Sequence, residues 1–436
     1  MMEAKPFLSF RSPAELIKDE PTYLALELVL YTMCAFTFAH AWRQRKTSPH
    51  LLLAWVSTIG HGFTTELVSY FLPDIDNFWH GHSMISLFRT RFPLHIVCFY
   101  PCVIYVAYAA AERLNFRWWA VPFAVGLLDV IIDVPFDILG IKFLWWTWHD
   151  TDPNVFDRHY YVPWTSYIFH MTFACSFTFL FNANSKAIKN GKKDASFFSR
   201  YLRPVLVTGV FTFPMGVSQF LPFYHLLHDG LSLHTEVCFF VLFLVYALIV
   251  WTEDRRAAAL SNGQPKKNNK KYSKKAPKQW YKKKELWWAL LVHYTFYMVL
   301  VLVADPSQVR ATGLHQGMTR SLTKCESSKD DVFTAFGQHL YRNTYLCLDH
   351  YDEDVSLRCP QSAGSEAHNI SDWPQWDDND EHIYRWYTLC GTAYSNWAEY
   401  TVIIWAFCIL GLVLYSNILL RPRRRSTPQT KHNKAE

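Results

Sequence analysis

The sequence has little of what marks a disordered chain or a small disulfide scaffold. Charged residues make up 18% of its 436 residues and hydrophobic residues 50%, so the chain has enough apolar surface to bury and fold. It has 10 cysteines, far fewer per residue than a disulfide-dense scaffold carries. We also find no internal repeat of fixed period. These absences leave two classes open, a large globular protein and a membrane protein.

The apolar residues are gathered into long runs, and the charged residues lie between them. The mean hydropathy of −0.02 resembles that of a soluble protein only because it averages these two kinds of segment. A helix needs about 20 apolar residues to cross the bilayer core. The sequence predicts runs of this length at Thr22–Trp42, His50–Leu72, Phe92–Ala111, Trp118–Ile141, Pro163–Phe181, Pro204–Tyr224, Ser232–Trp251, Leu286–Ala304 and Tyr400–Leu420.

The loops between these runs alternate in charge along the chain. Those after the first, third, fifth, seventh and ninth runs are basic, and Glu253–Glu285 has twelve Lys or Arg against three acids. The intervening loops are acidic or mixed. Basic loops stay in the cytoplasm, so the alternation predicts an exoplasmic N-terminus and a cytoplasmic C-terminus. We expect the first run to act as the insertion signal, because the residues before it are polar and mixed in charge.

The last exoplasmic loop, residues 305–399, has features of an oxidising compartment. It contains four cysteines, which fit two disulfides in any of three pairings: Cys325, Cys347, Cys359 and Cys390. Asn369 begins an Asn-Ile-Ser glycosylation sequon. The other cysteines lie in the apolar runs and are expected to pack as small side chains. The sequence therefore predicts a glycoprotein in a membrane of the secretory pathway, either the endoplasmic reticulum or the plasma membrane.

The predicted fold class is all-α. We expect a polytopic bundle of about nine transmembrane helices, with a small disulfide-bonded exoplasmic loop domain. The predicted order is an exoplasmic segment 1–21, a seven-span core 22–252, a polybasic cytoplasmic loop 253–285, a span 286–304, the exoplasmic domain 305–399, a span 400–420 and a basic tail 421–436.

The segment Lys266–Lys284 is low in complexity and strongly cationic. Each lysine near an anionic membrane surface contributes roughly 1 kcal/mol of binding free energy, so anionic lipid headgroups are the expected partner. Nucleic-acid binding is disfavoured, because the loop is tethered between two spans. A trafficking or topology signal without a ligand explains the charge equally well.

The fourth apolar run contains three acids. Asp129, Asp133 and Asp137 are spaced at i, i+4 and i+8, which puts them on one stripe of a helix. Ionisable groups within a span cost a few kcal/mol or more and point to function. Carboxylates this close cannot all ionise in a low dielectric, so we expect at least one to be protonated. A protonated acid beside an ionised one is what a general acid and base pair requires.

Further ionisable and aromatic residues are predicted at the same level of the membrane. The topology puts Glu66 in the outer third of the second run, and Asp133 and Asp137 in the outer half of the fourth. The same count puts these residues near them: His95, Trp146, Trp148, His170, His225, His228 and Glu236. We therefore predict an intramembrane polar cavity on the exoplasmic side. Structural hydrogen bonds between helices are the alternative, and the one that we expect for His293.

Histidines and carboxylates also suit a metal such as zinc or iron. The sequence, however, has neither an HExxH motif nor a repeated HxxHH motif. The nearest candidates are the set His225, His228 and Asp229 and the pair His80 and His82. We therefore predict no cofactor, with a divalent metal as the alternative.

Part of the chain resembles a known family of membrane enzymes. Asp129, Asp133 and Asp137 are followed by Trp145-Trp146-x-Trp148 and then by Tyr161-Val162-Pro163-Trp164. This order is similar to that of the polytopic carotenoid-biosynthesis proteins that include the bacterioruberin-type hydratases. In that family an earlier Glu and a Pro-containing entry to the next span take places similar to those of Glu66 and Pro93.

Over residues 60–182 the resemblance implies proton-driven hydration or cyclisation of a polyene or isoprenoid, without an organic cofactor. The proton donors and acceptors that it implies are Asp129, Asp133, Asp137 and Glu66. The Cys-bearing outer loop and the polybasic loop have no counterpart in that family. The chain is therefore also consistent with a eukaryotic membrane family that shares only the scaffold.

Three functions stay open. The first is a membrane enzyme that modifies a lipid or isoprenoid by carboxylate acid–base chemistry. The second is a proton-coupled transporter, because proton relays use the same residue types. The third is a receptor or interaction protein that acts through the exoplasmic loop, residues 305–399.

Overall fold

The computed structural model describes most of the chain. The described residues are 7–72, 75–88, 90–191, 194–262, 284–332, 334, 337–348, 351, 353–357, 359 and 382–420. Three sequence predictions lie outside them: the glycosylation of Asn369, the lipid contacts of residues 266–283 and the basic tail 421–436.

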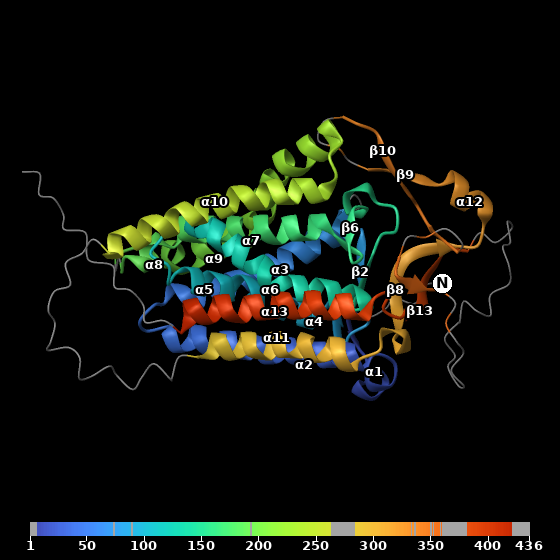
Figure 1. Cartoon of the computed structure of the whole chain (residues 1–436), viewed down its shortest axis with the longest axis horizontal. Helices are drawn as coiled ribbons and strands as arrows, with labels where there is room; N and C mark the ends of the chain where they lie inside the picture. Colours follow the sequence, from blue (N-terminus) through green and yellow to red (C-terminus); the bar gives the residue numbers. More distant parts are fainter. Residues whose placement is uncertain are drawn as a thin grey trace, which may run out of the picture.

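Most of the described residues are helical, and the long helices lie side by side in one bundle (Figure 1). Within the described part of the chain, six helical segments are long and apolar enough to cross a membrane: Pro21–Gln44 (α2), Leu94–Ala111, Phe198–Gly230, Thr235–Leu260, Glu285–Val303 (α11) and Trp397–Leu419 (α13). The remaining predicted runs form three further helices: α3 (His50–Phe71), α6 (Val121–Lys142) and α7 (Trp164–Asn184). Of these, α6 is apolar apart from its three acids and Lys142.

Three of the six apolar segments do not coincide with one α-helix. Two of them contain π-helical stretches, and the third is part of a longer helix. The segment 94–111 consists of α4 (Leu94–Tyr100), a π-helical turn and α5 (Val106–Ala111). The segment 198–230 consists of α9 (Arg203–Phe220) between two π-helical stretches, and the segment 235–260 is part of α10 (Thr235–Asn262). Short helices lie outside the bundle core: α1 (Pro13–Asp19), α8 (Lys186–Lys189) and α12 (Leu322–Ser327).

The helix with the three acids lies inside the bundle, and two of the apolar helices lie on its outside. Nearly all of α6 is buried, and it contacts α7, α10, α11 and α13. By contrast, α10 and α13 leave large apolar side chains exposed, among them Leu244, Leu248, Val402 and Leu410. Polar groups are costly against lipid and apolar ones are not. This order of layers is therefore the one that a membrane favours.

The close packing of α6 on α7 depends on Gly126. A Cβ atom at this position would lie 2.6 Å from the carbonyl oxygen of Met171, well inside van der Waals contact. Because glycine has no side chain, the backbone of α7 can pack directly against α6. This approach brings Ser166 and His170 of α7 within reach of the acids on α6.

Pro135 interrupts the hydrogen bonding of α6. Proline has no backbone N–H, so the carbonyl of Ile131 loses its helical donor. The hydroxyl of Tyr294 on α11 donates to that carbonyl at 3.2 Å, and Nε2 of His293 lies 2.9 Å from the carbonyl oxygen of Ile132. His293 thus makes the interhelical hydrogen bond that we expect from the sequence.

The described part of the chain also contains β-strands, so the fold is not purely helical as predicted. Residues 305–399 hold a four-stranded sheet in the order β11-β8-β13-β12, in which β8 (Arg310–Thr319) is antiparallel to β13 (Tyr384–Gly391). The other strands are β1 (Leu8–Phe10), β2 (Phe78–His80), β3 (Ile85–Leu87), β4 (Phe92–Pro93), β5 (Trp146–Trp148), β6 (Arg158–His159), β7 (Val162–Pro163), β9 (Lys329–Val332), β10 (Leu340–Asn343), β11 (Leu346–Cys347) and β12 (Val355–Ser356). These strands have two to four residues each, and most of them lie between the apolar runs, so hydropathy gave no signal for them.

Two disulfides join the four predicted cysteines and select one of the three pairings. Cys325 in α12 is bonded to Cys347 in β11, and Cys359 is bonded to Cys390 in β13. The remaining cysteines are free, and most of them are buried. The disulfides hold the helix and strands of residues 305–399 together as a small mixed α/β unit.

The loops gather at the two ends of the bundle, and ion pairs tie each end together (Figure 1). At one end, Arg43 in the last turn of α2 pairs with Glu285 at the start of α11. At the other end, β2 pairs with β5, and Arg158 binds Glu353 at 2.6 Å. The basic loops described thus meet at one end, and the acidic or mixed loops meet residues 305–399 at the other.

The sheet of residues 305–399 should lose stability in mild acid because of His315 on β8. This ring is 2% exposed, and burial lowers its pKa from the usual 6.5 to about 4. The unfolded chain binds a proton below 6.5 and the folded sheet does not, so stability falls as the pH drops from about 6.5 towards 4. Between pH 7.5 and pH 5 we expect a loss of about 2 kcal/mol.

Hydrogen exchange of β8 and β13 amides in the full chain, corrected for intrinsic rates, measures this loss. The variant His315→Gln should remove most of the pH dependence. Equal dependence in the variant and in the natural sequence would show that another group is responsible.

Candidate active site

A cavity of about 460 Å³ lies among α3, α4, α6, α7 and α9, towards the end of the bundle that carries β2 and β5. Its polar lining includes Glu66 from α3, Asp129 and Asp137 from α6, and Ser166 and His170 from α7. Much of the remaining lining is aromatic: Phe78, Phe99, Phe136, Phe169, Phe173, Phe213, Phe220, Trp146 and Trp148. The cavity is therefore more apolar than the sequence predicts, and its polar groups are concentrated at a few places.

The first polar group is built from the acid stripe of α6 and a histidine of α7. His170 lies between two aspartates, with Nδ1 at 3.2 Å from Oδ2 of Asp129 and Nε2 at 3.2 Å from Oδ1 of Asp133. Ser166 donates a hydrogen bond to Oδ2 of Asp137 at 2.7 Å. Residues four apart lie on the same helical face, so the pair Ser166 and His170 matches the stripe on α6. All three carboxyl groups are buried.

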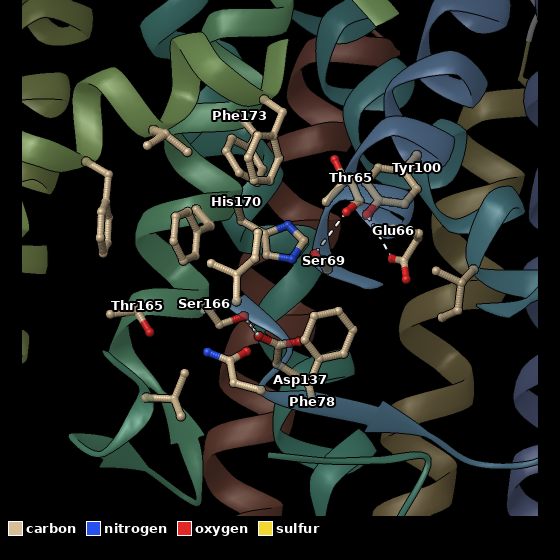
Figure 2. Close-up of a pocket in the computed structure, with 18 of the residues that line it drawn as sticks. Thr65, Glu66, Ser69, Phe78, Tyr100, Asp137, Thr165, Ser166, His170 and Phe173 are labelled. Carbon is tan, nitrogen blue, oxygen red and sulfur yellow. Dashed lines mark hydrogen bonds between the residues drawn. The ribbon is translucent and has the colours of Figure 1, made fainter. Parts of the chain in front are cut away.

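The second polar group lies on α3 and the segments next to it. Tyr100 donates a hydrogen bond to Oε1 of Glu66 at 3.1 Å, and Nε2 of His80 lies 3.6 Å from Oε2 of the same side chain. Figure 2 shows the pair Tyr100 and Glu66 facing the same space as His170, with Phe173 beside it. A substrate in this space would therefore meet ionisable groups from two directions.

The cavity reaches the outside of the bundle past apolar side chains. Two of its lining residues are strongly exposed, Leu72 after α3 (51%) and Leu221 after α9 (37%). Both are leucines, whereas the ionisable lining groups are buried or half-buried. An apolar mouth beside lipid-facing helices favours entry of a molecule that is itself dissolved in the membrane.

The acid stripe carries more negative charge than its described neighbours balance. The lining includes no Lys or Arg among the described residues, and Lys142 at the end of α6 binds Asp354 at 2.6 Å instead. His170 supplies at most one positive charge to three carboxylates. Buried charge of this kind is neutralised by protons or by a cation. Asp133, Asp137 and His170 each offer one ligand atom, and these atoms lie within 4.8 Å of one another, so they could hold one ion.

The structure brings most of the predicted site residues together. The lining includes seven of them: Glu66, Asp129, Asp137, Trp146, Trp148, His170 and His225. Asp133 is fully buried and contacts the cavity through His170.

Three residues predicted to line the cavity lie elsewhere. His95 is buried 4.0 Å from Glu27 and packs against Tyr23. His228 stacks on Tyr224, and Glu236 is exposed at the start of α10. Counting residues along a span predicts depth in the membrane but not the direction in which a side chain points, and this is why these three were misplaced.

The predicted metal candidates His225, His228 and Asp229 bind one another. Nδ1 of His225 lies 2.6 Å from one carboxylate oxygen of Asp229, and Nδ1 of His228 lies 2.7 Å from the other. The chain of contacts continues to Asp157, whose carboxylate lies 3.6 Å from Nε2 of His228 and 3.2 Å from Nε2 of His234. These groups form a hydrogen-bonded network at the end of the bundle.

Sequence reasoning missed several polar residues of the site. Ser166 precedes His170 by four residues, so the same helical spacing that revealed the acid stripe could have revealed it. Tyr100 and His61 are harder to find, because a tyrosine or histidine in an apolar run is ordinary membrane composition. Nδ1 of His61 lies 3.3 Å from the hydroxyl of Thr65, and its ring packs against Tyr100.

Removing His170, the basic side chain of α7 that contacts the acid stripe, should lower the stability of the bundle. In His170→Leu the carboxylates of Asp129 and Asp133 lose their partner, and breaking a buried ion pair costs about 3–5 kcal/mol. The double variant Asp133→Asn/His170→Leu should be more stable than His170→Leu alone, because it also removes a buried charge. Thermal unfolding in detergent, followed by tryptophan fluorescence, compares them. If the double variant unfolds at the lower temperature, the charge balance proposed for the stripe is wrong.

Comparisons with known proteins place the chain in a family without a described activity. The search of curated proteins finds no match, and the search of solved structures finds none. A family model described as "Domain of unknown function (DUF7802)" matches residues 2–419, which is nearly the whole chain. The chain therefore belongs to the DUF7802 family.

Proposed function

We propose that this protein is a multi-pass membrane enzyme that acts on an apolar, lipid-like substrate. The observation that carries the proposal is the position of His170 and the acid stripe on a largely aromatic cavity with an apolar mouth. Burying three carboxylates costs free energy that packing alone would not require. Ionisable groups concentrated on a pocket are typical of catalytic sites.

The lining of the cavity favours a lipid or an isoprenoid as the substrate class. Aromatic and aliphatic side chains cover much of its surface, and the exposed lining residues are Leu72 and Leu221. A volume of about 460 Å³ accommodates the reacting part of such a molecule, while its tail could remain in the bilayer at the mouth. The resemblance to carotenoid-biosynthesis proteins implies the same substrate class.

The two polar groups would act on the substrate from different directions. Glu66, held by Tyr100 and close to His80, is placed to take up or release a proton. The Asp129, Asp133 and His170 set would stabilise charge that develops on the substrate. The aromatic surroundings exclude water, which strengthens both effects.

The proposal includes the membrane topology predicted from the loop charges. In it α3, α6 and α7 also cross the membrane, so that nine spans connect an exoplasmic N-terminus to a cytoplasmic C-terminus in a secretory-pathway membrane. The sorting of loops to two ends supports this arrangement. The segment 266–284 would contact anionic lipids, and the disulfides of residues 305–399 suit an oxidising side.

Cells that lack the protein and are rescued with variants test the enzymatic proposal. Asp133→Asn and Asp137→Asn should fail to restore the lipid profile that the natural sequence restores. Glu66→Gln should lower the rate of recovery by roughly 10²–10⁴-fold if the carboxylate transfers a proton. Glu236→Gln is the matched control, because this exposed acid lies outside the cavity, and it should restore the profile fully.

Equal amounts of folded variant in the membrane must be shown first, by thermal unfolding of the purified proteins. Full rescue by both aspartate variants would contradict the proposal. Loss of a proton-dependent flux in reconstituted vesicles, without any change in cellular lipids, would assign the same residues to a transporter instead.

A further inference from the structure

We propose that Asp133, Asp137 and His170 bind one divalent transition-metal ion. The inference rests on the same site as the proposed function and names what occupies it. The ligand atoms come from two helices that pack closely through Gly126, so the set is positioned by a close backbone contact. None of the three side chains lies on a loop.

The spacing of the donor atoms suits a single ion. The three ligand atoms lie within 4.8 Å of one another, whereas the donors of a tetrahedral ion with bonds of about 2.1 Å lie roughly 3.4 Å apart. Nε2 of His170 approaches Oδ1 of Asp133 at 3.2 Å without hydrogen-bond geometry, which is the relation expected of two atoms that share an ion.

Asp133 is the residue whose chemistry most needs a cation. Its side chain is fully buried, and its Oδ1 lies 3.2 Å from Nε2 of His170, which also meets Asp129. Burying a carboxylate carries a large desolvation penalty, which one imidazole shared between two acids offsets only in part. Because the described lining of the cavity has no Lys or Arg, a bound ion would supply the missing positive charge.

Residues around the three ligands are arranged as in known metal sites. Asp129 lies 3.2 Å from Nδ1 of His170, so it would fix the ring with Nε2 free for the ion. Ser166 donates to Asp137 at 2.7 Å and holds that carboxylate in place. A carboxylate behind the ligating histidine and a hydrogen bond to the ligating acid are typical outer-shell contacts of metal centres.

The proposed ion would have an open side. Asp137 and His170 line the cavity, whereas Asp133 lies behind them. Three protein ligands and a face towards a substrate cavity are typical of catalytic sites rather than structural ones. One imidazole and two carboxylates suit zinc, iron or manganese, and the ion would bind water or polarise a substrate oxygen at the open position.

Metal content and Co²⁺ binding of the full chain test the inference. The protein purified in detergent should carry close to one equivalent of a transition metal by mass spectrometry. After treatment with a chelator it should bind Co²⁺ and develop a visible absorption band. Asp133→Asn and Asp137→Asn should weaken Co²⁺ binding by at least roughly 100-fold, and Asp129→Asn, which keeps all three ligands, by about 10–100-fold.

His228→Gln is the matched control, because this histidine also pairs with an aspartate but lies outside the cavity. Its Co²⁺ affinity should equal that of the natural sequence. If a ligand variant does not fold, Asp129→Asn still tests the inference, because it keeps all three ligands and changes only the carboxylate behind His170. Less than a tenth of an equivalent of metal and no Co²⁺ band would overturn the inference, and so would unchanged affinity in Asp137→Asn.

The outcomes separate this inference from the proposed function. If the aspartate variants fail to restore cellular lipids but the protein binds no metal, the metal inference is wrong and the enzymatic proposal stands. If the protein binds one metal at these residues and the same variants restore the lipids fully, the site exists and the proposed activity is wrong.

Discussion

The burial of three carboxylates on one helix is the constraint on which the rest of this structure depends. Asp129, Asp133 and Asp137 cannot face lipid without a large free-energy cost, so α6 has to lie at the centre of the bundle. His170 is the basic side chain that meets two of them. The remaining charge has to be neutralised locally, and this requirement links the packing of the helices to the chemistry of the site.

Several features of the fold follow from keeping α6 at the centre. Gly126 lets α7 approach closely enough to present Ser166 and His170 to the stripe. Tyr294 of α11 donates to the backbone carbonyl that Pro135 leaves without a partner. The apolar helices α10 and α13 form part of the outside. The residues that pack against α6 and hydrogen-bond to it therefore also fix the position of the cavity beside it.

The sequence predicted the parts of this structure that depend on spacing and failed where direction matters. The stripe on α6 and the four cysteines of the disulfides follow from residue identity and helical period. His95 and His228 were expected on the cavity but face other neighbours, because a count of residues along a span does not define the side of a helix. The sheet of residues 305–399 was not predicted because β8 and β13 lie outside the apolar runs from which the elements were predicted. The pairing of Glu66 with Tyr100 could not be predicted either, since it depends on how α3 packs against α4.

A cryo-electron microscopy map of the full chain in lipid nanodiscs would show whether the stripe and His170 form a reaction centre for a membrane-dissolved molecule. Elongated density should enter past Leu72 and Leu221 and end against His170. A cavity that contains only water, or one closed by side chains, would contradict this expectation.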